Sequence, residues 1–153
     1  MVRERHFEDN LLFDDANSSL RLSGRMLRLR RAENVATVTW KGPPTYVELV
    51  KSREELELVV SDPEAFERIL LGLGLRPTFR YQKYRETYAH DGAEVVIDET
   101  PIGTFLEIEA DAERIHALAQ ALGFSRTDYM LESYVELHRK SGATGDLVFE
   151  HEQ

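Results

Sequence analysis

The chain has 153 residues, with 19 Lys and Arg against 28 Asp and Glu, and therefore a formal net charge of −9 at pH 7. A hydrophobic content of 42% over this length predicts one compact, soluble domain spanning residues 1–153, and the lack of cysteine excludes disulfides and thiolate chemistry. The net acidity argues against duplex nucleic acid as a partner, and no apolar run reaches the roughly 18 to 20 residues of a membrane span. The start of the chain carries no secretory signal, so we expect a cytoplasmic protein with no membrane partner.

Period-2 alternation of apolar and polar residues predicts that strands dominate the structure. The expected strands are residues 4–13, 26–31, 35–41, 46–60, 79–89, 94–100 and 104–110, with a short tail strand at 147–150. Asp62 and Asp111 are suited to cap two helices that end near Gly72 and Gly123, and a last helix is expected over residues 128–140. Mainly antiparallel strands with helices between and after them define an α+β fold.

Several strands carry like-charged residues at positions i and i+2, which point to the same face of a sheet. The basic positions of this kind are Arg28 and Arg30 in one strand and Lys83 and Arg85 in another, and the acidic positions are Glu55, Glu57, Glu107 and Glu109. Leucines alternate with the charged residues in the same phase in strand after strand. This phase predicts that one face packs under the helices, through Leu27, Leu29, Leu56, Leu58, Leu106 and Ile108.

The charged face has two interpretations. It is either the solvated side of an ordinary half-exposed sheet or the inside of a sheet that curls into a barrel. Like-charged pairs repel each other, which favours an arrangement in which basic and acidic pairs face one another. Arg and Lys suit phosphate oxygens and paired carboxylates suit Mg²⁺ or Mn²⁺, so such a lumen would hold a metal-chelated polyphosphate.

An ordered set of motifs over nearly the whole chain resembles the CYTH superfamily, the triphosphate tunnel metalloenzymes. The motifs are His6–Asp14, Leu27–Arg30, Trp40–Gly42, Arg53–Glu57, Tyr81–Arg85, Asp98–Glu109 and Ser133–Tyr134. The resemblance implies an antiparallel β-barrel with helices packed outside. It also implies a divalent cation, Mg²⁺ or Mn²⁺, as cofactor and a small molecule with a triphosphate as partner.

The resemblance assigns roles to residues of the charged face. The residues implied to bind the substrate are Arg28, Arg30, Lys83 and Arg85, and those implied to be catalytic are Lys41 and Arg53. The implied metal positions are Glu55, Glu57, Asp98, Glu107 and Glu109. Cations would neutralise the phosphate charge, and the carboxylates would place the metal or the attacking group.

Three classes of function follow from these residues. The first is a class IV adenylyl cyclase-like enzyme, which converts ATP to cyclic AMP and pyrophosphate, or a triphosphatase acting on ATP, thiamine triphosphate or inorganic triphosphate. The second is a non-catalytic triphosphate or nucleotide binder. The third, a lipocalin-type barrel for apolar ligands, is disfavoured because its lumen would be lined by apolar residues.

One hallmark of the superfamily, an N-terminal Glu-x-Glu-x-Lys strand, is not found in this sequence. Two metal-site glutamates and a lysine would be missing with that strand. Their absence is the feature that favours the non-catalytic binder, while the enzyme stays the leading interpretation. We therefore expect triphosphates to be bound better than they are turned over. We also expect an unpaired sheet edge that favours a homodimer.

Overall fold

The computed structural model describes residues 1–150. Its strands are β1 (Arg3–Asp14), β2 (Met26–Ala32), β3 (Val35–Lys41), β4 (Thr45–Val47), β5 (Val50–Ser52), β6 (Glu55–Val60), β7 (Arg76–His90), β8 (Ala93–Thr100) and β9 (Gly103–Glu109). Its helices are α1 (Ser19–Leu22), α2 (Pro63–Gly72), α3 (Ala112–Ala121) and α4 (Tyr134–Lys140), with a 3₁₀ turn at Arg126–Asp128. No helix in this part of the chain is long and apolar enough to cross a membrane.

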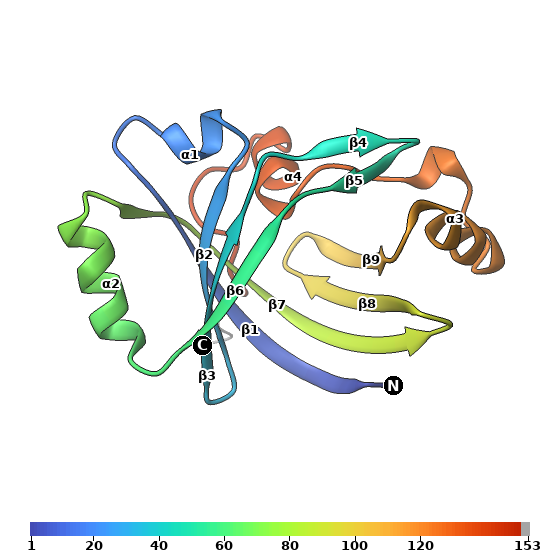
Figure 1. The fold of residues 1–153 in the computed structure, drawn as a ribbon, viewed down its shortest axis with the longest axis horizontal. Coiled ribbons are helices and arrows are strands. Elements are labelled where there is room, and N and C mark those ends of the chain that lie inside the picture. Colours follow the sequence, from blue (N-terminus) through green and yellow to red (C-terminus); the bar gives the residue numbers. More distant parts are fainter. Residues whose placement is uncertain (151–153) are drawn as a thin grey trace.

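Seven strands form one antiparallel sheet in the order β6-β3-β2-β1-β7-β8-β9. The sheet is strongly bent, so that β8 and β9 run across the direction of β2, β3 and β6 (Figure 1). The predicted α+β class with antiparallel strands is confirmed. The predicted barrel is not fully closed, because no ladder joins β6 to β9 within residues 1–150. Alternation identifies the two faces of a strand but not whether the end strands meet, so the sequence could not settle closure.

The two faces of the sheet carry separate hydrophobic clusters. On one face, α2 contributes Leu70 to a cluster with Phe13 and Leu29, and Leu27 packs against it. On the other face, α4 contributes Val135 to a second cluster. Its other buried members are Phe79 and Tyr81 of β7, with Leu147 from the C-terminal segment. We call the face under α4 the inner face and the face under α2 the outer face.

The helix starts expected from the sequence are confirmed for α2 and α3. The carboxylate of Asp62 accepts a hydrogen bond from the backbone N–H of Ala65 at 2.8 Å, and Pro63 begins the helix. Asp111 accepts one from the backbone N–H of Arg114 at 3.0 Å. Each cap binds a donor that the first helical turn leaves unpaired, and local sequence is enough to specify it.

Three other expectations are wrong in detail. Residues 46–60 form the β4–β5 hairpin and then β6, because the chain reverses at Glu48 and Leu49, whose φ angles are 49° and 65°. Residues other than glycine rarely adopt this conformation, so the sequence gives no signal for the turn. The last helix begins at Tyr134 rather than at residue 128, and the tail strand is a single bridge between Leu147 and Tyr81.

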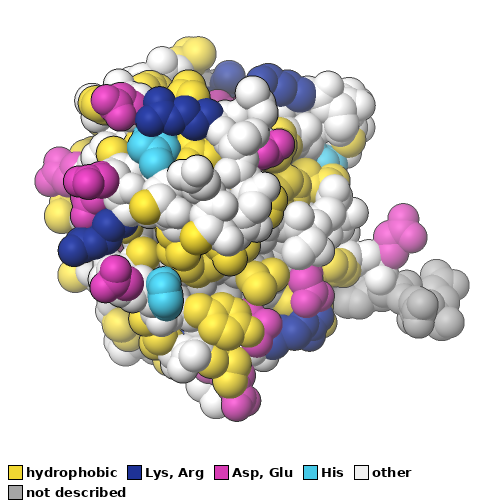
Figure 2. Space-filling model, turned by 90° about the vertical axis from the view of Figure 1, so that its right-hand side faces the viewer, with side chains coloured by type: hydrophobic (Ala, Val, Ile, Leu, Met, Phe, Trp, Pro, Cys, Tyr) yellow, Lys and Arg dark blue, Asp and Glu magenta, His cyan; other side chains and the backbone are white. Residues whose placement is uncertain are grey.

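The prediction that six apolar residues pack under helices is confirmed on β2 and wrong for Leu56, Leu58 and Leu106, whereas Ile108 of β9 is half-buried. Leu56 and Leu58 of β6 are 57% and 69% exposed, and Leu106 of β9 is 38% exposed. These strands end the sheet, and α2 and α4 cover its central strands instead. Hydrophobic side chains also reach the surface among charged ones on the side that carries α3 (Figure 2), where Leu122 and Phe124 are exposed.

Candidate functional site

The register of the strands brings the predicted charged residues together on the inner face. Residues directly opposite each other in an antiparallel pair point to the same face. Asn10 of β1 lies opposite both Arg30 and Tyr81. Glu8, two residues away on β1, lies opposite Lys83. The same rule places on this face Arg28 and Arg30 of β2, Lys83 and Arg85 of β7, Asp98 of β8 and Glu107 of β9.

Asp98 is the most heavily bonded carboxylate of the inner face, and its residue is fully buried. It accepts hydrogen bonds from Lys83 Nζ at 2.8 Å and from Arg85 Nε and Nη2 at 2.7 and 2.6 Å. Burial opposes its ionisation, but the hydrogen bond from Arg85 and the charge of Lys83 outweigh burial and hold the pKa of Asp98 at about 2. Asp98 therefore stays ionised and fixes two of the four predicted phosphate-binding cations.

Tyr134 connects α4 to this cluster. Its hydroxyl lies 2.7 Å from Asp98 Oδ2 and 2.6 Å from Glu107 Oε1. Burial and the neighbouring carboxylates raise the pKa of Tyr134, so the hydroxyl keeps its proton and donates it to one of these oxygens. Glu107 also accepts a hydrogen bond from Arg85 at 2.9 Å. The start of α4 is thus held against the acidic side of the site.

Arg28 is the predicted phosphate-binding cation without a carboxylate partner. Its residue is 8% exposed, and its guanidinium donates only to the hydroxyls of Tyr81 at 3.3 Å and Thr39 at 3.2 Å. Among residues 1–150 no carboxylate lies within 4.0 Å of it, and its Nε makes no hydrogen bond. Burial opposes its charge, but Tyr81 and Glu8 raise the pKa of Arg28, so the guanidinium remains charged.

The remaining predicted residues lie nearer the margin of the inner face. Arg30 Nη2 lies 3.4 Å from both carboxylate oxygens of Glu57, and Lys41 Nζ lies 2.5 Å from Glu55. Arg53 takes no part in these ion pairs, since it donates to the backbone oxygens of Gly42 at 2.9 Å and Gly24 at 3.0 Å. Arg53 therefore links two loops through their backbone carbonyl oxygens.

Glu109 differs from the other predicted metal positions because no cation pairs with it in the described part of the chain. It lies opposite Glu94 in the sheet and two residues from Glu107. Its side chain reaches solvent, but the surrounding protein removes part of the water from the carboxylate. This partial loss of water and the repulsion from Glu107 raise the pKa of Glu109. An excess of negative charge therefore collects at this end of β9.

The carboxylates are not assembled into a protein-only metal cage. No group of three His, Cys, Asp or Glu side chains among the described residues is arranged to hold a metal ion. Asp98, Glu55 and Glu57 already pair with lysine, arginine or hydroxyl groups. The donor set fits a cation that takes one or two protein carboxylates and fills its other positions with water and phosphate oxygens, as Mg²⁺ does. Glu109, which no described cation pairs with, is the carboxylate present for that role, and Glu107 lies two residues from it but already accepts from Arg85 and Tyr134.

Sequence reasoning missed three further polar residues of the inner face. His6, Glu8 and Asn10 alternate along β1 and are all buried. Both side-chain amide atoms of Asn10 and Oε2 of Glu8 have no hydrogen-bond partner. Their i, i+2 spacing was a signal of a shared face, but their mixed chemistry hid it. Tyr134 belongs to the Ser133–Tyr134 motif of the resemblance, but its contact with Asp98 spans 36 residues of sequence and was not predicted.

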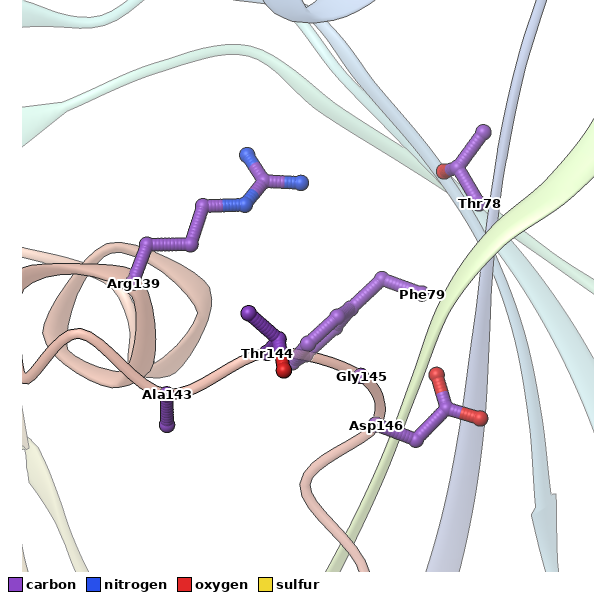
Figure 3. A pocket seen from close by; sticks show the side chains of 7 residues that line it. All are labelled: Thr78, Phe79, Arg139, Ala143, Thr144, Gly145 and Asp146. Atoms are coloured by element: carbon purple, nitrogen blue, oxygen red, sulfur yellow. The ribbon is translucent and has the colours of Figure 1, made fainter.

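A shallow pocket lies away from this cluster. It has a volume of about 330 Å³ and is formed by the loop at residues 143–146 with Arg139 of α4 and the start of β7 (Figure 3). The side chain of Arg139 lies on one side of it and that of Asp146 on another. None of the charged residues of the inner face lines this pocket.

Comparison with known proteins supports the assignment of the fold. A family model described as the CYTH domain matches residues 3–134. A Methanocaldococcus jannaschii protein named "Putative adenylate cyclase MJ0240" is 28% identical over 145 residues, which cover 88% of this chain and 82% of that protein.

Two solved structures extend the comparison. The protein PH1819 from Pyrococcus horikoshii OT3 has a TM-score of 0.78 at 21% identity, covering 91% of this chain and 86% of that one. The Hippeastrum protein HpAC1 has a TM-score of 0.69 at 19% identity, covering 91% and 84%. The bent antiparallel sheet, its charged inner face and the match of the family model over most of its length lead to one conclusion: this chain belongs to the CYTH domain family.

Proposed function

We propose that the protein binds a triphosphate, together with Mg²⁺ or Mn²⁺, on the inner face of its sheet and hydrolyses it. The observation that carries this proposal is the buried guanidinium of Arg28, which has no carboxylate partner in the described structure and keeps its Nε unpaired. A buried charge with no carboxylate in direct contact is costly. An anionic ligand at this position would supply the missing partner.

The neighbours of Arg28 support an extended anion rather than a single carboxylate. Arg30, Lys83 and Arg85 share its face, and arginine can bind phosphate oxygens through two parallel hydrogen bonds. Together these side chains would neutralise the charge on the transferred and leaving phosphates. Glu107 and Glu109 would hold the cation, which when bound polarises the scissile phosphoryl group.

Names of relatives suggest two outcomes of the reaction. The structure of HpAC1 is described as revealing a dominant triphosphatase activity, whereas the M. jannaschii relative carries the name "Putative adenylate cyclase MJ0240". We place hydrolysis first and cyclisation of ATP second. A cyclase must also position the ribose hydroxyl against the α-phosphate, a requirement that hydrolysis does not have.

The test is a product assay. Phosphate, pyrophosphate and cyclic AMP are measured from ATP, inorganic triphosphate and thiamine triphosphate, each with Mg²⁺, with Mn²⁺ and with chelator. We expect metal-dependent release of phosphate, and we expect it to be fastest with inorganic triphosphate. Cyclic AMP as the main product would favour the cyclase, and binding without turnover would favour a non-catalytic module. No binding of any triphosphate would reject the proposal.

A matched pair of variants assigns the binding to the inner face. Arg28→Met keeps the buried stem and removes the charge, and it should weaken triphosphate binding by ~1.5–3 kcal/mol without lowering the Tm of the free protein. Arg31→Met makes the same change on the outer face, where Arg31 pairs with Glu67 of α2 at 2.5 Å. The control should lower stability slightly and leave binding unchanged. Equal affinity in the two variants would place the ligand elsewhere.

A further inference from the structure

We propose that Glu8 is an internal counter-anion that positions the basic residues of the free protein and competes with the triphosphate for them. The inference rests on the proposed function, since it concerns the same site. Glu8 is a positioning residue in this scheme. It would act through the cations around it rather than by contact with the reacting bond or the metal.

The position of Glu8 supports this role. Its side chain is 1% exposed and lies on the inner face, opposite Lys83 in the sheet. Oε1 lies 3.6 Å from Arg30 Nη1, and Oε2 lies 3.6 Å from Lys83 Nζ. Burial opposes its charge, but attraction to Lys83 and Arg85 lowers the pKa of Glu8. One carboxylate thus sits between cations from β2 and β7.

The contacts of Glu8 are looser than those of Asp98. Lys83 Nζ lies 2.8 Å from Asp98 but 3.6 Å from Glu8, and Oε2 of Glu8 makes no hydrogen bond. His6 supports the other oxygen, with Nε2 3.3 Å from Oε1 while Nδ1 lies 2.9 Å from the backbone oxygen of Glu4. Asp98 therefore binds its cations directly, whereas Glu8 mainly offsets the charge between them.

The same charge has opposite effects before and after the ligand binds. In the free protein, Glu8 offsets the repulsion among Arg28, Arg30, Lys83 and Arg85. A triphosphate that contacts these cations brings several negative charges close to a buried carboxylate, and the repulsion is strong because little water separates them. Glu8 therefore stabilises the empty site and limits the affinity of the occupied one.

Glu8→Gln tests the proposal, because it removes the charge and keeps the shape. We expect inorganic triphosphate to bind about tenfold more tightly or better, while the free protein melts at a lower temperature. The gain should shrink from triphosphate to pyrophosphate to orthophosphate, in the order of ligand charge. Glu8→Asp keeps the charge, so its affinity should stay near that of the unchanged protein.

Asp9→Asn is the matched control on the outer face, where Asp9 pairs with Arg80. It removes one negative charge from the same strand and should leave triphosphate affinity unchanged. If Glu8→Gln is too unstable for titration, the rise in Tm produced by saturating triphosphate is compared instead, and it should exceed that of the unchanged protein.

Two results would separate failure of this inference from failure of the proposed function. If the unchanged protein binds triphosphate and Glu8→Gln binds it no more tightly, Glu8 has only a structural role and the inference is wrong. If the unchanged protein does not bind triphosphate, the proposed function fails first. An equal gain in Asp9→Asn would show that net charge alone is responsible, and it would also overturn the inference.

Discussion

Asp98 is the residue on which most ion pairs of the inner face depend. It accepts hydrogen bonds from Lys83 and Arg85 and contacts the hydroxyl of Tyr134. Its pKa of about 2 lies below the usual 3.8, so the folded state favours the ionised carboxylate. The stability that this charge contributes is fully present above the pKa of the unfolded chain and is lost as pH falls toward 2.

Asp98→Asn should lower the free energy of unfolding at pH 7 by about 2 kcal/mol, because the shift is nearly two pKa units at about 1.36 kcal/mol each. The difference from the unchanged protein should stay constant down to about pH 5 and shrink between about pH 4 and pH 2. Urea titrations at pH 7 and pH 3 measure both values. A difference that is equal at the two pH values would mean that packing, not charge, explains the loss.

Glu109 gives a prediction of the opposite sign. Loss of water and repulsion from Glu107 raise the pKa of Glu109, so its ionised form destabilises the folded state once pH rises above the usual range of a glutamate. Glu109→Gln should raise the Tm at pH 7 and have little effect at pH 3, where the carboxyl is protonated. If Glu109 also holds the cation, the same variant should need more Mg²⁺ for half-maximal turnover. A lower Tm at pH 7 would contradict the charge argument.

At the scale of elements, α4 connects packing to the site. Ser133 caps it by accepting from the backbone N–H of Glu136, whose carboxylate accepts from the backbone N–H of Ser133 in return. The next residue, Tyr134, contacts Asp98 and Glu107. A short helix with a good cap therefore places one hydroxyl between two carboxylates on other elements.

Ser133→Ala should cost about 1 kcal/mol of stability, as the loss of an N-cap does, and should also weaken triphosphate binding because Tyr134 becomes less well held. Ser125→Ala is the matched control. Ser125 makes a similar capping box with Asp128, but the 3₁₀ turn that it caps carries no residue of the site. Comparison of Tm and triphosphate affinity in both variants checks the prediction. An equal loss of affinity in both would remove the special role of α4.

The same scale explains what the sequence could and could not predict. Alternation predicted that Arg28 and Arg30 point to one face of the sheet and Leu27 and Leu29 to the other. The outer cluster under α2 confirms this, because Leu29 belongs to it and Leu27 packs against it. Caps at Asp62 and Asp111 depend on a donor three residues away, so they too could be predicted. Whether sheet ends meet depends on accumulated twist and bending, which no local pattern records.

Contacts between distant elements were the part of the site that the sequence could not supply. Tyr134 reaches Asp98 and Glu107 only because α4 packs against Tyr81 on the inner face. Arg53 shows the same limit of sequence-based prediction. Its spacing suggested that it belongs to the charged face, but its guanidinium donates to two loop carbonyl oxygens. Alternation assigns a face to a side chain, but rotamers and loop geometry decide what the side chain binds.

At the scale of the whole molecule, the sheet ends at β6, where apolar side chains meet solvent on both faces. Leu58 and Val59 are 69% and 75% exposed, although Val60 at the end of β6 packs against the cluster under α2. Exposed strands of this kind pair with other chains unless charges or prolines prevent it. Glu55 and Glu57 are the only charged residues within β6.

We expect two copies to pair antiparallel through β6, giving a homodimer with a continuous sheet. A register with Leu58 opposite its own copy sets Glu57 against Val59, so that no two carboxylates face each other. Leu58→Lys should convert the dimer to a monomer, because two like charges would then meet at the two-fold axis. Leu71→Lys changes a leucine on α2 that is 52% exposed and should leave the dimer intact. Sedimentation velocity over a range of concentrations measures both, and a protein that stays monomeric, or two variants that behave alike, would contradict pairing through β6.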